Sequence, residues 1–234
     1  MKEVLRLGDE DAFVTTRHFS FFLKNAEELG DPENQKKFLK SLVDNPMKVP
    51  RRFVYLNQVH GGQVATLDAA SEHFTRLTET DAVVTDLKDL GLIVMTADCL
   101  SVFFFAGDWV GLAHAGWRGT RDRISAKTLQ TIAARSGLKP ENVKIIFGPC
   151  IRACHYEVGE EFRGFFGSDA VQECEGRLVF DLALENKKQL LKAGASERSI
   201  SDSGICTVCQ NRDFYSYRLE KESAGRMISW VALQ

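Results

Sequence analysis

The chain has 234 residues, of which 44% are hydrophobic and 26% are charged. This is the composition of an ordinary globular protein, so the disordered and fibrous classes are excluded. The 30 basic and 32 acidic residues leave a net charge of −2, without the basic excess that a nucleic-acid-binding surface requires. We therefore expect a small neutral or anionic substrate, and no nucleic acid as a partner.

The first thirteen residues carry four acids and no apolar run, so they do not resemble a signal peptide. The longest apolar stretch, Gly91–Trp117, is interrupted by Asp98, Asp108 and His114. These interruptions indicate consecutive buried strands rather than a membrane span. We expect a cytoplasmic protein with no membrane partner. Its six cysteines are then expected to be reduced thiols or metal ligands, not disulfides.

The first predicted elements are a helix and a pair of strands. The polar stretch Asn25–Asp44 indicates a loop followed by a surface helix, which begins at Asp31-Pro32-Glu33. Arg52–Val59 has the alternation of a strand, and Gly61-Gly62 then turns the chain into a second strand at Gln63–Leu67. This arrangement predicts a β-hairpin.

Short runs of Val, Ile, Leu and Phe follow, and they are typical of strands covered on both faces. These predicted strands are Ala82–Thr85, Leu92–Thr96, Ser101–Phe105, Trp109–Ala113, Val143–Phe147 and the tail Met227–Ala232. Two helices are predicted among them. One is Thr120–Arg135, which Gly137 ends, and the other runs from the N-cap Asp181 to Gly194.

Mixed strands and helices with tight turns predict an α/β fold of layered mixed sheets rather than a doubly wound nucleotide fold. No glycine-rich phosphate loop follows any strand, so a nucleotide-phosphate fold has no support. No internal repeat or Pro/Gly/Ser-rich linker divides the sequence. Residues 1–234 are therefore expected to form one domain.

Three side chains that zinc accepts stand where predicted strands meet turns, and they are His60, Cys99 and His114. Catalytic zinc has three protein ligands and an open fourth position, where the pKa of a bound water falls to roughly 7. The pattern therefore predicts one zinc site. The residues alone leave a second interpretation open, because strand-end histidines and buried cysteines usually pack in the core. The spacing of the three residues matches no local metal motif.

Other candidate residues carry less specific signals. The CxxC pair Cys206 and Cys209 can join Cys150 and Cys154 in a four-cysteine structural zinc site, or can simply pack. The dipeptide Cys154-His155 is another conceivable ligand pair.

Two charged residues adjoin the predicted zinc ligands. Arg118 suits bidentate contact with a phosphate or carboxylate, although it can also be an exposed residue of a helix-entry loop. Asp98, beside Cys99, can orient a metal ligand or cap a turn.

Several motifs occur in a fixed order along the chain. They are Asn57-Gln58-Val59-His60-Gly61, Thr96-Ala97-Asp98-Cys99, Leu112-Ala113-His114-Ala115-Gly116-Trp117-Arg118-Gly119, Gly148-Pro149-Cys150-Ile151, Cys154-His155-Tyr156-Glu157-Val158-Gly159, Cys206-Thr207-Val208-Cys209, Phe214-Tyr215-Ser216-Tyr217-Arg218 and Gly225-Arg226. Together they resemble the YfiH-like, or laccase-domain, family of purine nucleoside phosphorylases. One segment departs from the family pattern, because His18-Phe19-Ser20 stands where Gly-Gly-Val-Ser is typical.

The resemblance implies a single YfiH-like catalytic domain with an α/β/β/α arrangement of layered mixed sheets flanked by helices. It implies one Zn²⁺ ion on His60, Cys99 and His114, the three residues selected above. It further implies phosphorolysis of adenosine, inosine, guanosine and 5′-methylthioadenosine, and adenosine deamination by a zinc-activated water. Phosphorolysis requires an anion site, for which Arg118 is the candidate. The expected partners are a purine nucleoside and phosphate.

Three other functions compete with this interpretation. The older family label, copper-dependent polyphenol oxidase, requires many imidazoles for a multicopper centre, and this chain has five histidines. One copper ion in place of zinc remains open. A peptidoglycan-precursor editing amidase can use the same zinc site on an amide carbonyl. A binding protein with a structural zinc requires a fourth protein ligand, from Cys150, Cys154 or His155.

Overall fold

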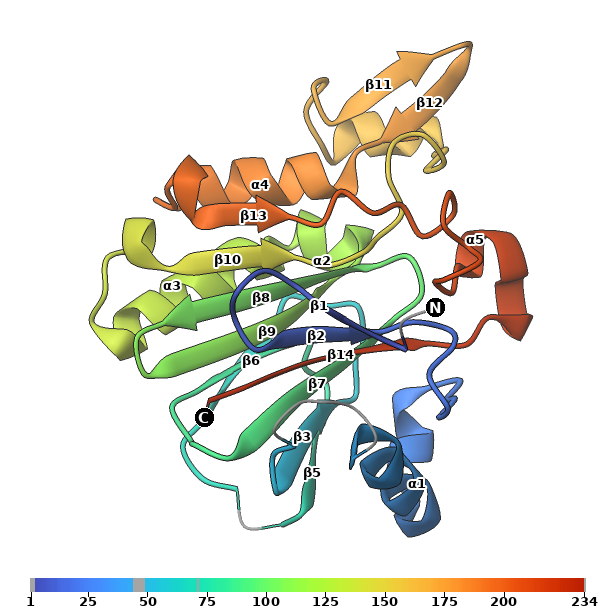
Figure 1. The fold of residues 1–234 in the computed structure, drawn as a ribbon. Helices are drawn as coiled ribbons and strands as arrows, with labels where there is room; N and C mark the ends of the chain where they lie inside the picture. The colour runs from blue at the N-terminus through green and yellow to red at the C-terminus, as the bar shows by residue number, and fades with distance from the viewer. Residues whose placement is uncertain (1–2, 44–48, 71, 234) are drawn as a thin grey trace.

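The computed structural model describes residues 3–43, 49–70 and 72–233. Within these residues, two six-stranded sheets lie face to face and helices cover both outer faces, as Figure 1 shows. The first sheet has the strand order β1-β2-β14-β7-β3-β5. Its strands are β1 (Val4–Arg6), β2 (Ala12–Thr15), β14 (Met227–Ala232), β7 (Leu90–Thr96), β3 (Arg52–Leu56) and β5 (Phe74–Leu77).

The second sheet has the strand order β13-β10-β8-β9-β6-β4. Its strands are β13 (Ile200–Asp202), β10 (Lys144–Phe147), β8 (Leu100–Ala106), β9 (Trp109–Ala115), β6 (Ala82–Thr85) and β4 (Val64–Leu67). Both sheets are mixed. β3 pairs in parallel with β5 and β7, and β4 pairs in parallel with β6, whereas β8 and β9 are antiparallel. The predicted α/β class with layered mixed sheets is confirmed.

Residues alternate along each strand between two hydrophobic cores, because a strand points successive side chains to opposite faces. In β8, Phe103 lies in the core between the sheets, whereas Val102 and Phe104 pack against the helices on the outer face. In β14, Met227 belongs to the core between the sheets and Trp230 to the opposite outer core. The central strands are therefore almost entirely buried, as their continuous apolar runs predicted.

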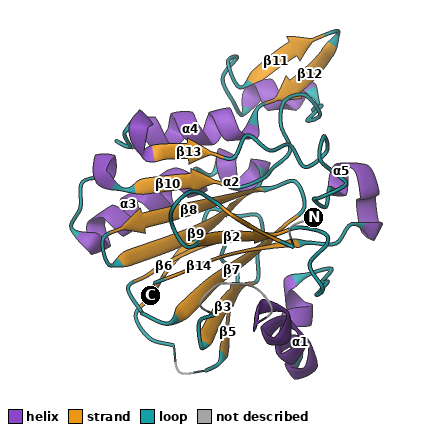
Figure 2. Cartoon of the chain, in the orientation of Figure 1, coloured by secondary structure: helices purple, strands orange, loops and turns teal. Residues whose placement is uncertain are grey.

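The helices form the two outer layers, as Figure 2 shows. α1 (Pro32–Val43) covers the first sheet, and the Phe38 ring meets the Phe53 ring of β3 at a centroid distance of 5.4 Å. α3 (Ile124–Ser136) and α4 (Leu182–Lys192) cover the second sheet. Shorter helices complete the description: α2 (Trp117–Arg121), α5 (Tyr217–Glu220), η1 (Ala26–Gly30), η2 (Pro140–Asn142), η3 (Glu160–Gly164), η4 (Glu197–Ser199) and η5 (Lys221–Ser223).

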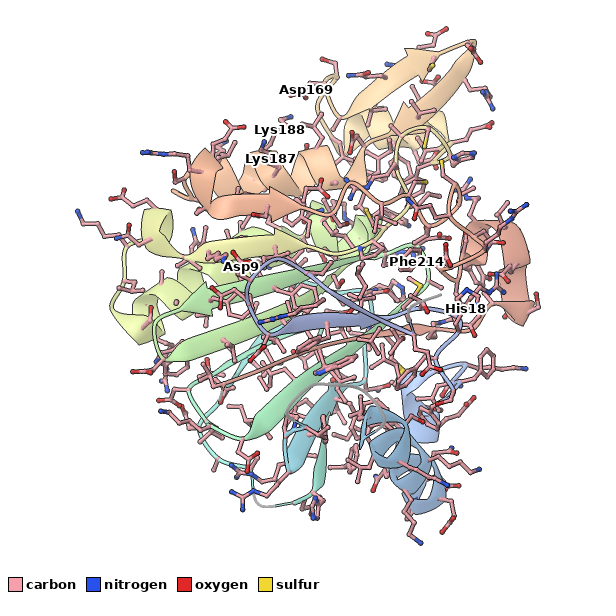
Figure 3. The ribbon with its side chains drawn as sticks, viewed as in Figure 1. Asp9, His18, Asp169, Lys187, Lys188 and Phe214 are labelled. Carbon is pink, nitrogen blue, oxygen red and sulfur yellow. The ribbon has the colours of Figure 1, made fainter. Side chains whose placement is uncertain are left out.

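A two-stranded hairpin projects beyond α4 and belongs to neither large sheet (Figure 1). It consists of β11 (Val171–Cys174) and β12 (Arg177–Phe180). Lys188 of α4 pairs with Asp169 at 2.5 Å, and the two labels lie close together in Figure 3. The Phe166 and Phe180 rings stack at a centroid distance of 4.4 Å, so an apolar contact also fixes the base of the hairpin.

The predicted hairpin from Arg52–Val59 to Gln63–Leu67 is wrong. β3 ends at Leu56 and belongs to the first sheet, whereas β4 belongs to the second. Gly61-Gly62 therefore lies in a crossing between layers. The glycine pair marks a sharp bend in the chain, but its composition does not determine which strand is the partner.

The predicted helix Thr120–Arg135 is two helices in the structure. α2 begins earlier, at Trp117, and the chain breaks at Arg123, whose φ of 63° is left-handed and not helical. Gly137 does cap the second helix, with a φ of 72°. The predicted start of α1 and the N-cap Asp181, which accepts a hydrogen bond from the Leu184 amide at 2.9 Å, are confirmed. Asp44, the predicted end of the first polar stretch, lies outside the described residues.

No helix within the described residues is both long enough and apolar enough to cross a membrane.

Candidate metal centre and pocket

The structure brings His60, Cys99 and His114 together. One ligand atom from each lies within 4.8 Å of the others. The two imidazole rings meet edge to face, with a centroid distance of 4.8 Å and an interplanar angle of 82°. Segments from both sheets and from the crossing between them thus converge on one point, and the three donors are close enough to share one metal ion.

Each donor reaches this point from a different local structure. His114 lies within β9, one residue before its end, and is 2% exposed. Cys99 lies in the tight connection between β7 and β8, after Asp98 with its left-handed φ of 91°. His60 is exposed and lies four residues beyond the end of β3, with a φ of 60°. Left-handed backbone is unfavourable for non-glycine residues, so surrounding bonds must hold it in place.

Asp81, which the sequence analysis did not select, provides those bonds. Its carboxylate accepts hydrogen bonds from the backbone amides of Val59, His60 and Gly61 at 3.2, 3.0 and 2.8 Å. It also contacts His114 Nδ1 at 2.8 Å, and both side chains are buried. A histidine whose Nδ1 is bonded to a carboxylate presents Nε2 to a metal in a fixed orientation. One buried acid therefore positions two of the three donors.

Asp98 has a different role from the metal-orienting one considered above. Its carboxylate accepts hydrogen bonds from the Thr207 hydroxyl and from the Arg218 amide, both at 2.6 Å. The Asp98 carbonyl accepts from the Ile151 amide at 2.9 Å. Asp98 thus ties three later segments of the chain to the loop that carries Cys99.

The close contact of the donors changes the pKa values of Cys99 and His114. Burial alone would raise the pKa of the Cys99 thiol, but the charge of His114 and hydrogen bonds from both histidines outweigh burial and lower the pKa to about 6. Burial would lower the pKa of His114, but Cys99 and Asp81 raise that pKa to about 9. Without a metal, the pair at neutral pH is therefore a thiolate beside an imidazolium, and a bound cation would replace the imidazolium proton.

Gly116 leaves the donors accessible. A Cβ atom at this position would lie 3.0 Å from Cys99 Sγ, 3.2 Å from His60 Cδ2 and 3.9 Å from His114 Cε1. The φ and ψ of Gly116, −79° and 176°, are open to any residue, so the need for glycine is steric rather than conformational. The absence of a side chain at Gly116 leaves a space beside all three donors, which we call the cradle.

The donors line a cavity of about 820 Å³ that extends over the ends of both sheets. Apolar side chains cover part of its wall, including Met95, Trp117, Ile151 and Leu182. Burial raises the pKa of Tyr156, which also lines the cavity, so its hydroxyl is a neutral donor at pH 7. The cavity begins at Lys24 in chain order and does not include the atypical segment 18–20.

Five cations line the same cavity, namely Lys24, Arg118, Arg218, Lys221 and Arg226. Within the described residues, none of the five forms an ion pair with a carboxylate. The Arg118 guanidinium lies over the Trp117 ring, 4.3 Å from its centroid. Three acidic residues, Glu27, Asp98 and Glu222, also line the cavity, so the cations outnumber the acids. This excess of positive charge at a concave surface favours an anionic ligand.

A second group of donors lies outside this cavity. Cys154, His155, Cys206 and Cys209 place one ligand atom each within 4.8 Å of one another. Cys150 is not a member of the group. It is fully buried and forms a backbone bridge with Cys206, so the sulfur-only set considered above is replaced by three cysteines and a histidine.

Comparison with known proteins yields several relatives named purine nucleoside phosphorylase. The chain is 37% identical over 155 residues to the protein of that name from Aquifex aeolicus (strain VF5), which covers 66% of this chain and 72% of the relative. It is 30% identical over 241 residues to the Haemophilus influenzae protein of the same name, covering 94% and 93% of the two chains.

The fold is also similar to solved structures. The crystal structure of the Bacillus licheniformis hypothetical protein YfiH superposes with a TM-score of 0.82 at 26% identity, covering 95% of this chain and 92% of the other. These matches confirm the YfiH-like resemblance carried by the motifs. A family model described as multi-copper polyphenol oxidoreductase laccase matches residues 14–234. The chain therefore belongs to this family of YfiH-like proteins.

Proposed function

We propose that this chain is a zinc-dependent purine nucleoside phosphorylase. The substrates would be adenosine, inosine, guanosine and 5′-methylthioadenosine, and adenosine would also be deaminated. The observation that carries the proposal is the juxtaposition in one cavity of a three-donor cluster with five unpaired cations. Relatives named purine nucleoside phosphorylase support the substrate class.

The donor set fits one zinc ion. His60, Cys99 and His114 supply two nitrogens and one sulfur, and Gly116 keeps space open beside all three. Three protein ligands with an open position are the pattern of catalytic zinc. A zinc ion held there would polarise a substrate oxygen, or lower the pKa of a bound water to roughly 7.

A multicopper centre does not fit. Such a centre requires many imidazoles, and the chain has five histidines. Two of them lie in this cluster and His155 lies in the other donor group, while His18 is bonded to Asp213 at 3.1 Å. A single copper ion in place of zinc is the only copper chemistry that the cluster supports within the described residues.

Side chains of the cavity would bind the phosphate and the purine during phosphorolysis. In this reaction the C1′–N bond of the nucleoside breaks, a phosphate oxygen bonds to C1′, and the purine leaves with a proton. Arg118 and Arg218 would hold the phosphate, because guanidinium groups match its oxygens in pairs. The apolar wall at Met95 and Ile151 would cover the purine, and Tyr156 would donate a hydrogen bond from its neutral hydroxyl.

Incubation with adenosine, with and without phosphate, tests the proposal by product analysis. Adenine and ribose 1-phosphate, formed only with phosphate, are the expected main products, and inosine would report deamination. No turnover of any nucleoside would contradict the proposal. Release of L-serine from a muramyl precursor would instead support the editing amidase.

Two glycine variants make the test specific to the cradle. Gly116→Ala is expected to reduce turnover sharply, because its methyl group would meet Cys99 Sγ. Gly164→Ala is the matched control, since nothing lies within 4 Å of the added carbon. Equal activity of the two variants would contradict a reaction at the three donors.

A further inference from the structure

The second donor group lies where two distant segments of the chain meet. Cys154 and His155 belong to the turn after β10, and Cys206 and Cys209 belong to the turn after β13. The Cys150 amide donates to the Ile205 carbonyl at 3.2 Å, and the Thr207 amide donates to the Cys150 carbonyl at 3.1 Å. Backbone pairing therefore holds the two turns together and brings all four side chains to one side.

A single nitrogen faces all three sulfurs. His155 Nδ1 lies 3.2 Å from Cys154 Sγ, 3.4 Å from Cys209 Sγ and 3.9 Å from Cys206 Sγ. Cys154 Sγ in turn lies 3.7 Å from both other sulfurs. One proton on that nitrogen can satisfy only one sulfur, so hydrogen bonding alone does not explain why the three converge on it.

These separations are those of a tetrahedron around zinc. Zinc–sulfur bonds of about 2.3 Å and zinc–nitrogen bonds of about 2.0 Å put two sulfurs about 3.8 Å apart, and a sulfur and a nitrogen about 3.5 Å apart. The sulfur–sulfur distances of 3.7 Å match the first value. The three sulfur–nitrogen distances, from 3.2 to 3.9 Å, scatter around the second. A disulfide would require the sulfurs to be roughly 2 Å apart.

The nearby arginine does not take the place of a metal. Arg152, in the same turn as Cys154, forms two hydrogen bonds with the Asp202 carboxylate, at 2.7 and 2.6 Å. Its guanidinium is therefore already neutralised by an acid. Three soft sulfur donors and a borderline imidazole nitrogen suit zinc better than the hard cations Mg²⁺ or Ca²⁺.

We propose that Cys154, His155, Cys206 and Cys209 hold a second, structural zinc ion. Four protein ligands close the coordination sphere, in contrast to the three-donor cluster in the cavity. This proposal does not depend on the proposed function, because the two groups share no residue.

The second ion would stabilise the segment that forms one wall of the cavity. Ile151, which precedes the first turn, and Thr207, which lies within the second, both bond to Asp98, the residue before Cys99. Ile151 also lines the cavity, as does Tyr156 directly after His155. Binding of zinc would thus fix the position of this wall relative to the Cys99 loop without touching the substrate.

The zinc content of protein purified under reducing conditions, without added metal, tests the proposal. Elemental analysis is expected to give one equivalent of zinc per chain fewer for Cys154→Ser and for Cys209→Ser than for the unmodified protein, and this difference does not depend on the cavity site. Cys174→Ser is the matched control, because Cys174 is exposed and outside both groups, and it should retain the zinc content of the unmodified protein. Zinc content that is unchanged in Cys154→Ser and Cys209→Ser would overturn the proposal.

The Cys99→Ser variant provides a second measurement if the other variants do not fold. It is expected to lose the cavity zinc and retain the structural one, which protects Cys154, Cys206 and Cys209 from alkylation until a chelator is added. Alkylation of the three at the same rate with and without chelator would overturn the proposal. So would a disulfide among them in the purified protein. Because Cys99→Ser removes only the cavity donor, loss of nucleoside turnover with protection retained would separate the two sites.

Discussion

A single buried carboxylate determines the geometry of the cavity donors. Asp81 bonds to His114 Nδ1 and to three consecutive backbone amides around His60. The residue types and positions of the donors are visible in the sequence, whereas the role of Asp81 is not. The signal was present, since an acid directly before the apolar strand Ala82–Thr85 requires partners if that strand is buried. Which partners it finds depends on long-range pairing, and this the local sequence does not specify.

Asp81→Asn is expected to lower zinc affinity by about 10–100-fold, because the amide nitrogen cannot accept the bonds that the lost oxygen accepted. Competition with a chromophoric chelator measures this affinity. Asp68→Asn is the control, since Asp68 is exposed and pairs with Arg135 away from the donors. Equal affinities for Asp81→Asn and Asp68→Asn would show that Asp81 does not position the metal ligands.

The Cys99–His114 pair predicts a pH dependence for the metal-free protein. Because its pKa is lowered to about 6, the Cys99 thiol is mostly ionised at pH 7 and becomes protonated only as the pH falls through that value. Its alkylation rate, followed by peptide mass spectrometry, should therefore have a midpoint at about pH 6. An ordinary cysteine has its midpoint at about pH 8.5. A midpoint at that ordinary value would refute the thiolate–imidazolium pair, and His114→Ala should raise the midpoint.

At the scale of elements, a buried polar network holds the helices that flank the cavity. Asn186 of α4 donates to the Thr120 hydroxyl of α2 at 2.9 Å and accepts from the Ser125 hydroxyl of α3 at 2.6 Å. All three side chains are fully buried. The network lies at the break between α2 and α3, where the left-handed Arg123 changes the direction of the chain. It thereby fixes the orientation of α2, which carries Arg118.

Asn186→Ala is expected to lower the free energy of unfolding by about 2–3 kcal/mol, because it leaves two buried hydroxyls without a partner. Urea denaturation measures the change. Lys192→Ala, an exposed position on the same helix, should change stability by less than about 0.5 kcal/mol. A similar small effect at Asn186 would mean that the hydroxyls find other partners.

The apolar periodicity at Thr120–Arg135 predicted one helix, and the structure has two. The periodicity does mark the buried face, because Leu129, Ile132 and Ala133 pack against the second sheet. The break was not visible, because Arg123 has no intrinsic preference for left-handed backbone. The bonds from Asn186 to Thr120 and Ser125 hold the two helices on either side of this break.

At the scale of the molecule, the core between the sheets joins the two sheets of the fold. Phe103 belongs to it and is fully buried, among side chains from both sheets. The sequence predicted this layered architecture, because strands covered on both faces read as continuous apolar runs. It did not predict strand order. β3 and β4 are neighbours in the sequence but lie in different sheets, and the choice depends on partners far along the chain.

Phe103→Ala is expected to lower the free energy of unfolding by about 3–5 kcal/mol, since neighbours on two sheets cannot both move into the space. Leu138→Ala is the control, because Leu138 is 36% exposed and should cost less than about 1 kcal/mol. Chemical denaturation compares them. Comparable losses would indicate that the two sheets can close over the vacated volume.

β14 has a consequence for how the molecule is made. It lies between β2 and β7, and its Ile228 amide bonds to the hydroxyl of Thr15, 213 positions earlier. During synthesis, β2 therefore emerges from the ribosome long before β14. Until β14 is made, the edge of β2 that pairs with it has unpaired backbone groups, which can associate with other chains. The first sheet can close only after the ribosome has produced residues 227–232, so a protein shortened before them would be expected to aggregate rather than fold.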